Sequence, residues 1–165
     1  MSIFRKSHTE VKRLSVITWN VWFDDFKKKE RYDEILAICK SMSVDVICLQ
    51  EVTPCFLKKV KEHELAEYYD VSDPDLNGAT VGSYGVLTMC RRELNASFQW
   101  QELPTNMGRK LLTANINMHV GSLSIGNVHL ESLNSAPARL EQLKLCNKVL
   151  NRTAYSVLCG DFNFD

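Results

Sequence analysis

The order in which strand-like and helix-like segments follow one another constrains the fold of this chain more than any other feature. Short β-branched apolar runs, typical of strands, first alternate with amphipathic segments. A series of strand-like runs joined by short turns follows, and then a last helix and a last strand. This order predicts an α/β fold in which two mixed sheets pack face to face with helices outside them, a four-layer α/β sandwich. The predicted strands span residues 14–19, 44–49, 84–90, 97–103, 111–120, 123–130 and 155–159.

Three segments have the periodicity or the end signals of helices. Residues 27–42 carry apolar side chains at helical spacing, and residues 54–65 begin with a proline directly after a threonine, a favourable N-cap. Residues 70–82 collect Asp, Pro, Asn, Gly and Ser, which predicts a loop. Residues 136–150 form a strong amphipathic helix whose predicted buried side consists of aliphatic residues, namely Leu140, Leu143, Leu145, Val149 and Leu150.

The composition is that of one ordinary globular domain without a strong charge. The chain has 165 residues, of which 45% are hydrophobic, and its 20 basic residues balance 20 acidic ones. A net charge of zero provides no overall field that would attract nucleic acid or a membrane, so nucleic-acid binding would depend on a local patch. We expect residues 1–12 to be a disordered lead-in and residues 13–165 to form the domain.

Cysteine usage indicates an intracellular protein. The chain has six cysteines without a C-x-x-C pair, and most of them lie in apolar runs, where a free thiol packs as a small hydrophobic group. We therefore expect reduced thiols and a nuclear or cytoplasmic location. The N-terminus lacks the apolar stretch of a signal peptide, and no window is apolar for long enough to span a bilayer, so we expect no membrane partner.

Polar side chains follow three of the predicted strands directly. Asn20 comes after VITW, Gln50 and Glu51 come after VICL, and Asp161 and Asn163 come at the end of VLCGDFN. In layered α/β folds ligands gather at strand ends, so these side chains could converge on one site. Taken singly, each of them could also be a polar residue that ends a strand and has no chemical role.

The motifs TWN, LQEV and GDFN occur in this order, and a fourth motif, HLES at residues 129–132, lies between the last two. Together they resemble the endonuclease/exonuclease/phosphatase superfamily, over about residues 14–165. HLES, a loop of small residues and a helix that begins ARLEQL are similar to the tyrosyl-DNA phosphodiesterase 2 branch, which hydrolyses the 5′-phosphotyrosyl bond left by trapped type II topoisomerases. GDFN departs from the GDTN that is common in this branch, and is widespread elsewhere in the superfamily.

These residue types suit the hydrolysis of a phosphodiester, whose negative charge repels a nucleophile and grows on oxygen in the transition state. A divalent cation offsets that charge, and Glu51 offers the hard oxygen donor that Mg²⁺ or Mn²⁺ would use. We expect Asn20 to donate to a phosphoryl oxygen while its carbonyl takes part in the metal site, and Asp161 to position or deprotonate the attacking water. Asn163 and His129 would donate to phosphoryl oxygens, although His129 could instead be a core histidine.

Three further residues are candidates for contacts with the substrate. Ser132, in HLES, would be a positioning donor, and Arg109 would clamp a phosphate with its guanidinium, a surface arginine being the alternative. Tyr84 lies where a base or a leaving-group ring could stack, and packing within a strand is the alternative. We expect Trp19, in the first motif, to be a core residue.

The residues and the resemblance together predict a divalent-metal-dependent phosphodiesterase or nuclease, which acts in DNA repair on DNA 5′ ends with a phosphotyrosyl adduct. The resemblance also implies an S-D-H segment downstream of GDFN. The sequence has none, so we expect the C-terminal part of the domain to be missing, and this chain alone could lack activity. The alternatives are an RNA deadenylase, an abasic-site endonuclease, a lipid or inositol phosphatase, and a catalytically dead module that binds phosphorylated ends.

Overall fold

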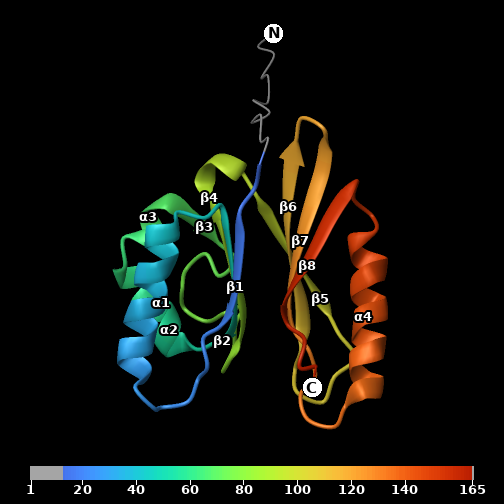
Figure 1. Ribbon diagram of the computed structural model, residues 1–165, viewed down its shortest axis with the longest axis horizontal. Helices are drawn as coiled ribbons and strands as arrows, with labels where there is room; N and C mark the ends of the chain where they lie inside the picture. The colour runs from blue at the N-terminus through green and yellow to red at the C-terminus, as the bar shows by residue number, and fades with distance from the viewer. Residues whose placement is uncertain (1–12, 165) are drawn as a thin grey trace.

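The computed structural model describes residues 13–164, and the predicted lead-in over residues 1–12 lies outside the described residues (Figure 1). The strands are β1 (Val16–Asn20), β2 (Val46–Val52), β3 (Tyr69–Val71), β4 (Gly85–Arg91), β5 (Ser97–Glu102), β6 (Lys110–Met118), β7 (Gly121–His129) and β8 (Tyr155–Asp161). They form two four-stranded sheets: the first has the strand order β1-β2-β4-β3, and the second has the order β5-β6-β7-β8.

The first sheet brings the TWN and LQEV motifs side by side because β1 and β2 are parallel. Their register pairs Asn20 with Gln50, so both strands carry their polar ends to the same edge of the sheet. β2 lies between β1 and β4 and is buried along nearly its whole length, which explains its continuous apolar run. The register between β2 and β4 shifts between Leu49 and Val52, the stretch that contains Glu51.

The second sheet places HLES beside GDFN in the same way. β7 and β8 are parallel, and their register pairs His129 with Asp161. β5, β6 and β7 are joined as antiparallel neighbours, as the short connections in the sequence predict. Both sheets therefore end a parallel pair of strands with polar residues, and these ends face each other across the molecule.

Helices cover the outer face of each sheet, which confirms the predicted four-layer α/β sandwich. α1 (Lys28–Met42), α2 (Pro54–Glu62) and the short α3 (Leu65–Tyr68) lie against the first sheet, and α4 (Ala136–Leu150) lies against the second (Figure 1). A 3-10 helix, η1 (Arg92–Leu94), connects the sheets in the chain. Buried apolar side chains fill the space between the first sheet and its helices, between the two sheets, and between the second sheet and α4.

The cysteines and the helices add two facts about the described part of the chain. All six cysteines are free thiols, and Cys39, Cys48, Cys90 and Cys146 are buried, as their apolar surroundings predict. None of the helices within residues 13–164 combines the length and the apolar character needed to cross a membrane.

Two predicted boundaries in the first half of the chain are wrong. Residues 70–82 are not a loop throughout, because the first of them belong to β3, which pairs with β4. The helix predicted over residues 54–65 ends at Glu62, since His63 adopts an extended backbone and interrupts the helical hydrogen bonds. The short helix α3 then follows as a separate element.

The buried side of α4 agrees with the predicted one at Leu143, Leu145, Val149 and Leu150, which pack on the second sheet, and differs at Leu140. Leu140 is 54% exposed, whereas Arg139 and Gln142 are buried. These two polar side chains hydrogen-bond to Glu131 after the end of β7, so the first half of the helix buries polar groups that have partners. Trp19, which we expected in the core, is 36% exposed because β1 is an edge strand of its sheet.

Candidate active site between the two sheets

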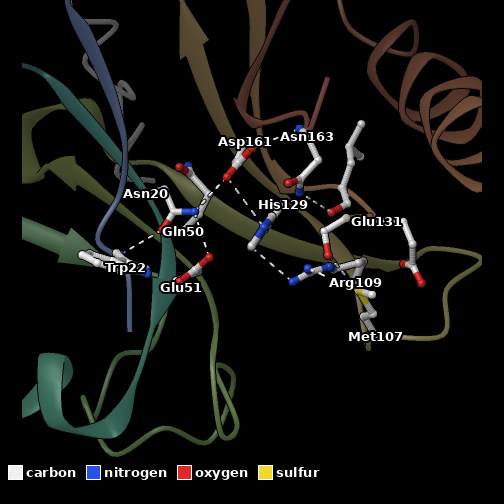
Figure 2. Close-up of polar contacts among 12 residues, drawn as sticks. Asn20, Trp22, Gln50, Glu51, Met107, Arg109, His129, Glu131, Asp161 and Asn163 are labelled. Atoms are coloured by element: carbon white, nitrogen blue, oxygen red, sulfur yellow. Dashed lines mark hydrogen bonds and ion pairs between the residues drawn. The ribbon is translucent and has the colours of Figure 1, made fainter. Parts of the chain in front are cut away.

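The polar ends of β1, β2, β7 and β8 meet where the two sheets face each other (Figure 2). Asn20 Nδ2 donates to Glu51 Oε1 at 3.0 Å and to Asp161 Oδ2 at 2.8 Å, and so joins carboxylates of both sheets. Its Oδ1 accepts from the backbone N–H of Trp22 at 2.9 Å. These neighbours dictate the orientation of the amide, because only its NH₂ group can face two carboxylates.

Glu51 enters this site through an unusual backbone conformation. Its φ of 57° lies in the left-handed region, which costs a non-glycine residue about 1–2 kcal/mol. Besides the contact of Oε1 with Asn20, Oε2 accepts from the backbone N–H of Phe23 at 3.0 Å, so both carboxylate oxygens are held. A strained residue whose side chain is fixed in this way is typical of functional sites.

Gln50, next to Glu51, points instead into the space between the sheets. Its Nε2 donates to Asn127 Oδ1 at 2.8 Å. Asn127 Nδ2 in turn donates to the backbone oxygens of Leu49 at 3.2 Å and Leu87 at 2.9 Å. Because Gln50 and Asn127 are both buried, this link ties β7 firmly to β2 and β4 and sets the separation of the two halves of the site.

His129 lies between a carboxylate and a guanidinium. Its Nε2 is 3.7 Å from Asp161 Oδ2, and its Nδ1 is 3.1 Å from Arg109 Nη1. A guanidinium can only donate, so Nδ1 accepts and the proton of the ring is on Nε2. Burial lowers the pKa of His129 and Arg109 lowers it further, while Asp161 and Glu51 oppose the shift. The neutral form with an Nε2–H directed toward the carboxylates is therefore favoured.

We call Asn20, Glu51, His129 and Asp161 the seam cluster, because two of these residues come from each sheet. Figure 2 shows their side chains pointing toward one another. The strand ends indicated Asn20, Glu51 and Asp161, and the HLES motif indicated His129. In the structure the four form one group of polar side chains connected through Asn20 and Asp161.

Arg109 and Tyr84 lie beside the seam cluster. Arg109 is only 7% exposed, so it is not a surface arginine. Its Cζ is 5.7 Å from the ring centroid of Tyr84, and that ring is 5.2 Å from the ring of Phe23. Together with Trp100 and His129, both residues line a cavity next to the cluster.

Asn163 and Ser132 have partners within the protein. The backbone N–H of Asn163 donates to Asp161 Oδ1 at 3.0 Å, and Asn163 Nδ2 donates to Leu130 O at 2.9 Å. Asn163 therefore helps to fix the Asp161 carboxylate. Ser132 Oγ contacts Met107 Sδ at 3.3 Å. Its hydroxyl therefore lies to one side of the seam cluster.

The donors of the seam cluster fit a hard divalent cation that keeps several of its waters. Glu51 and Asp161 provide carboxylates on two sides of Asn20. Residues 13–164 hold no group of three or more His, Cys, Asp or Glu side chains arranged as a metal cage. Mg²⁺, which needs few protein ligands, suits this set of donors better than Zn²⁺ does. Oxygens of both Asn20 and Glu51 accept hydrogen bonds from the protein, but only Glu51 carries a negative charge, so Glu51 is the better ligand for a divalent cation.

Sequence reasoning missed the buried side chains that support the cluster. Asn127, Glu131 and Gln142 are buried and hydrogen-bonded, yet each stands within or beside an apolar run. The available signal is a polar residue at a position that the surrounding pattern marks as interior, since such a residue needs partners. Glu131 even belongs to the HLES motif, in which we assigned roles only to His129 and Ser132.

Comparison with known proteins gives a family match over most of the chain. A family model described as Endonuclease/Exonuclease/phosphatase family matches residues 17–165. Tyrosyl-DNA phosphodiesterase 2 of Danio rerio is 25% identical over 169 residues, which cover 96% of this chain and 43% of that protein. The protein of the same name from Xenopus tropicalis is 27% identical over 139 residues, which cover 81% of this chain and 35% of that protein. The chain thus spans less than half the length of these relatives.

Solved structures show the same fold. The crystal structure of the D. rerio tyrosyl-DNA phosphodiesterase 2 complexed with single-strand DNA product has a TM-score of 0.76 at 25% identity, covering 92% of this chain and 61% of that chain. The Caenorhabditis elegans protein has a TM-score of 0.77 at 20% identity, covering 92% of this chain and 48% of that chain. With this fold and the family match over residues 17–165, the chain belongs to the endonuclease/exonuclease/phosphatase family of hydrolases.

Proposed function

We propose that the chain carries the metal- and phosphate-binding centre of a divalent-metal-dependent phosphodiester hydrolase that acts in DNA repair on DNA 5′ ends with a phosphotyrosyl adduct. The observation that supports this most directly is the seam cluster itself. Asn20 holds Glu51 and Asp161 together across the sheets, and His129 faces Asp161 from the neighbouring strand. Two acidic groups, an amide and a histidine at one point are the groups that bind a cation, a phosphate and a water.

Mg²⁺ or Mn²⁺ at Glu51 would offset negative charge on the phosphate and polarise the bond to be broken. The protein's own groups orient the carboxylate and donate to the phosphate. Asn20 and Phe23 N–H keep the Glu51 carboxylate in one orientation, so little reorganisation is needed when the substrate binds. The Nε2–H of His129 is a donor for a phosphoryl oxygen at the edge of the cluster.

Asp161 is suited to hold the attacking water. Its Oδ1 is fixed by the N–H of Asn163 and its Oδ2 by Asn20, so the carboxylate cannot rotate away, and a lone pair on either oxygen can accept a proton from water. Asn163 Nδ2 uses one of its two hydrogens on Leu130 O, which leaves the other for an oxygen of the substrate.

DNA as the substrate is supported by the relative of known structure that binds a single-strand DNA product. The cavity lined by Tyr84, Trp100 and Arg109 offers aromatic faces and a cation next to His129. The cavity, about 40 Å³, is too small to enclose a ring, so a nucleobase or the phenol ring of a tyrosyl leaving group would stack against these side chains at its opening. Because the overall net charge is zero, binding of the substrate would depend on a local surface such as this one.

The test is Mg²⁺-dependent release of tyrosine from a single-stranded oligonucleotide with a 5′-phosphotyrosyl end. It is made with the chain of 165 residues and with the longest natural protein that contains it. We expect Glu51→Gln and Asp161→Asn to lower turnover by about 10²–10³-fold with the fold intact. The matched controls are Glu67→Gln and Asp75→Asn, because both of these residues are exposed and lie outside the cluster.

The alternatives predict other results in the same experiment. Unchanged turnover in Glu51→Gln would contradict the assignment of the site. Turnover of RNA or of lipid phosphodiesters, without release of tyrosine, would reject the DNA substrate and keep the hydrolase. Binding of a 5′-phosphorylated oligonucleotide without any turnover, in both forms of the protein, would favour the catalytically dead module.

A further inference from the structure

We propose that Glu131 is a positioning residue for His129: its buried carboxylate holds the turn that carries Arg109, and Arg109 in turn fixes the tautomer of His129. The inference concerns geometry within the chain and rests on the proposed function only for its catalytic consequence. Figure 2 shows the Arg109 side chain extending toward His129, with Glu131 and Met107 on the side of Arg109 away from the seam cluster.

The first step is the contact between Glu131 and the turn that joins β5 to β6. Glu131 is 2% exposed, and its Oε2 accepts from Thr105 Oγ1 at 2.6 Å while its Oε1 accepts from the backbone N–H of Asn106 at 2.9 Å. Gln142 adds a third donor, Nε2 to Oε2 at 3.2 Å. A carboxylate with these donors is held in a single orientation and pulls the turn onto the end of β7.

The second step leads from Thr105 to Arg109. Thr105 Oγ1 donates to Glu131 and therefore offers its lone pairs to the turn, where it accepts from the backbone N–H of Met107 at 2.9 Å and of Arg109 at 3.2 Å. The Thr105 hydroxyl thus holds the backbone of the turn at both Met107 and Arg109. Because the backbone of Arg109 is fixed by this hydroxyl, the direction of its side chain depends on the contact between Thr105 and Glu131.

The third step is the contact between Arg109 and His129, whose Nη1 and Nδ1 are 3.1 Å apart. Arg109 is buried, but its Nε has no hydrogen-bond partner, and within residues 13–164 it makes no ion pair with a carboxylate. Its Nη2 has only a weak acceptor, Met107 Sδ in the same turn at 3.7 Å, and its Cζ is 5.7 Å from the centre of the Tyr84 ring. The turn keeps it in place, and its N–H selects the His129 tautomer with the proton on Nε2.

Helix α4 secures the other side of Glu131. Arg139 Nη1 donates to the backbone oxygens of Glu131 at 3.1 Å and of Leu133 at 2.9 Å, and Gln142 Oε1 accepts from the Glu131 N–H at 2.9 Å. These contacts explain why α4 buries two polar residues in place of Leu140. Because these contacts fix the backbone of Glu131, its carboxylate determines the position of the turn between β5 and β6, and not the reverse.

The experiment is long-range ¹H–¹⁵N NMR of the His129 ring, which distinguishes the two tautomers through the ¹⁵N shifts of Nδ1 and Nε2. In the parent chain we expect one tautomer, with Nε2 protonated. In Glu131→Gln and in Thr105→Val we expect a mixture of tautomers, and in Thr105→Ser, which keeps the hydroxyl, we expect the parent spectrum. Thr153→Val is the matched control, because the Thr153 hydroxyl contacts only the end of α4 and the start of β8.

Turnover adds a second readout in the same variants. We expect Glu131→Gln to lower kcat/KM about 10–100-fold, and to have no further effect when Arg109→Ala is already present, because both residues act through His129. A single His129 tautomer that is unchanged in both Glu131→Gln and Thr105→Val would overturn the proposal, and so would additive losses in the double variant. Absence of turnover in both the 165-residue chain and the longest natural protein that contains it would overturn the proposed function, and the NMR spectra would still decide the role of Glu131.

Discussion

Single carboxylates organise whole segments of this chain, and Asp73 does so outside the candidate site. Asp73 is fully buried, and its oxygens accept from the backbone N–H groups of Asn77, Gly78 and Thr80 and from the Thr80 hydroxyl. Burial alone would raise the pKa of Asp73, but the hydrogen bonds outweigh it and lower the pKa. The loop before Tyr84 therefore depends on the ionised form of one side chain.

Replacing this carboxylate should make part of the stability independent of pH. Because the pKa of Asp73 is lower in the folded state, its contribution is present above the unfolded-state pKa of about 3.9 and is lost as the pH falls through the folded-state pKa. We expect Asp73→Asn to lower the free energy of unfolding by about 2 kcal/mol at pH 7. The difference from the parent should narrow below about pH 4.

Urea unfolding at several pH values between 7 and 3 measures this difference. Asp75→Asn is the control, because Asp75 lies in the same loop but is exposed. A gap between Asp73→Asn and the parent that stays constant down to pH 3 would show that the charge of Asp73 has no part in holding the loop.

At the scale of elements, the parallel pair β7 and β8 determines whether His129 and Asp161 meet. Gly160, which pairs with Val128, has a φ of +139°, and a Cβ on it would lie 1.9 Å from Val128 O. The backbones of the two strands thus touch directly before Asp161. Asn127, one residue before Val128, adds the buried link to the first sheet.

Gly160→Ala should disrupt this end of the pair. The backbone conformation alone costs a side chain about 1–3 kcal/mol, and the overlap with Val128 O adds to that figure. Gly82→Ala is the control, because Gly82 also has a positive φ but a Cβ there would meet nothing within 4 Å. Thermal unfolding should show a clearly larger loss for Gly160→Ala, and equal losses for both variants would contradict the close approach of the strands.

Asn127→Ala should weaken the packing of one sheet on the other. It removes the donor to the backbone oxygens of Leu49 and Leu87 and one of the acceptors of Gln50 Nε2, which keeps Thr18 Oγ1 and Cys48 O, and the loss costs roughly 2 kcal/mol. Asn151→Ala, at an exposed residue after α4, is the control and should change little. Chemical denaturation measures both, and a loss below about 0.5 kcal/mol for Asn127→Ala would mean that water replaces the amide.

The elements and the residues of the seam cluster could largely be predicted from the sequence, because strand ends and their order carry that information. The burial of Arg139 and Gln142 in α4 could not be predicted, because both are polar and only their hydrogen bonds to the buried Glu131 explain their interior positions. β3 was hidden among turn-forming residues, because a strand of three residues has too little pattern to read. The partners of Ser132 and Arg109 were likewise set by tertiary contacts and not by local sequence.

At the scale of the whole molecule, one edge strand of the first sheet, β1, lies next to one edge strand of the second sheet, β8. β1 ends one sheet and β8 ends the other, and Asn20 and Asp161 connect them. Both strands leave apolar side chains in contact with solvent: Val16 is 36% exposed and Val157 is 46% exposed. Open edges with apolar side chains favour pairing with strands of another molecule.

We expect the 165-residue chain to self-associate at high concentration through these edges. The double variant Val16→Lys and Val157→Lys should remain monomeric, because charges on an edge strand oppose pairing. Val120→Lys is the control, since Val120 is exposed in the turn between β6 and β7. Sedimentation velocity measures the association, and equal association of the double variant and the control would rule out the edges as the contact.

The two sheets are also separate in the chain itself. Every strand of the first sheet precedes η1 and every strand of the second follows it, so Asn20 and Glu51 belong to one half of the chain and His129 and Asp161 to the other. A break at Asn95 would give two pieces, each with two of the four residues of the seam cluster. On the proposed function, hydrolysis would then occur only where the two pieces have associated, so it would measure their association.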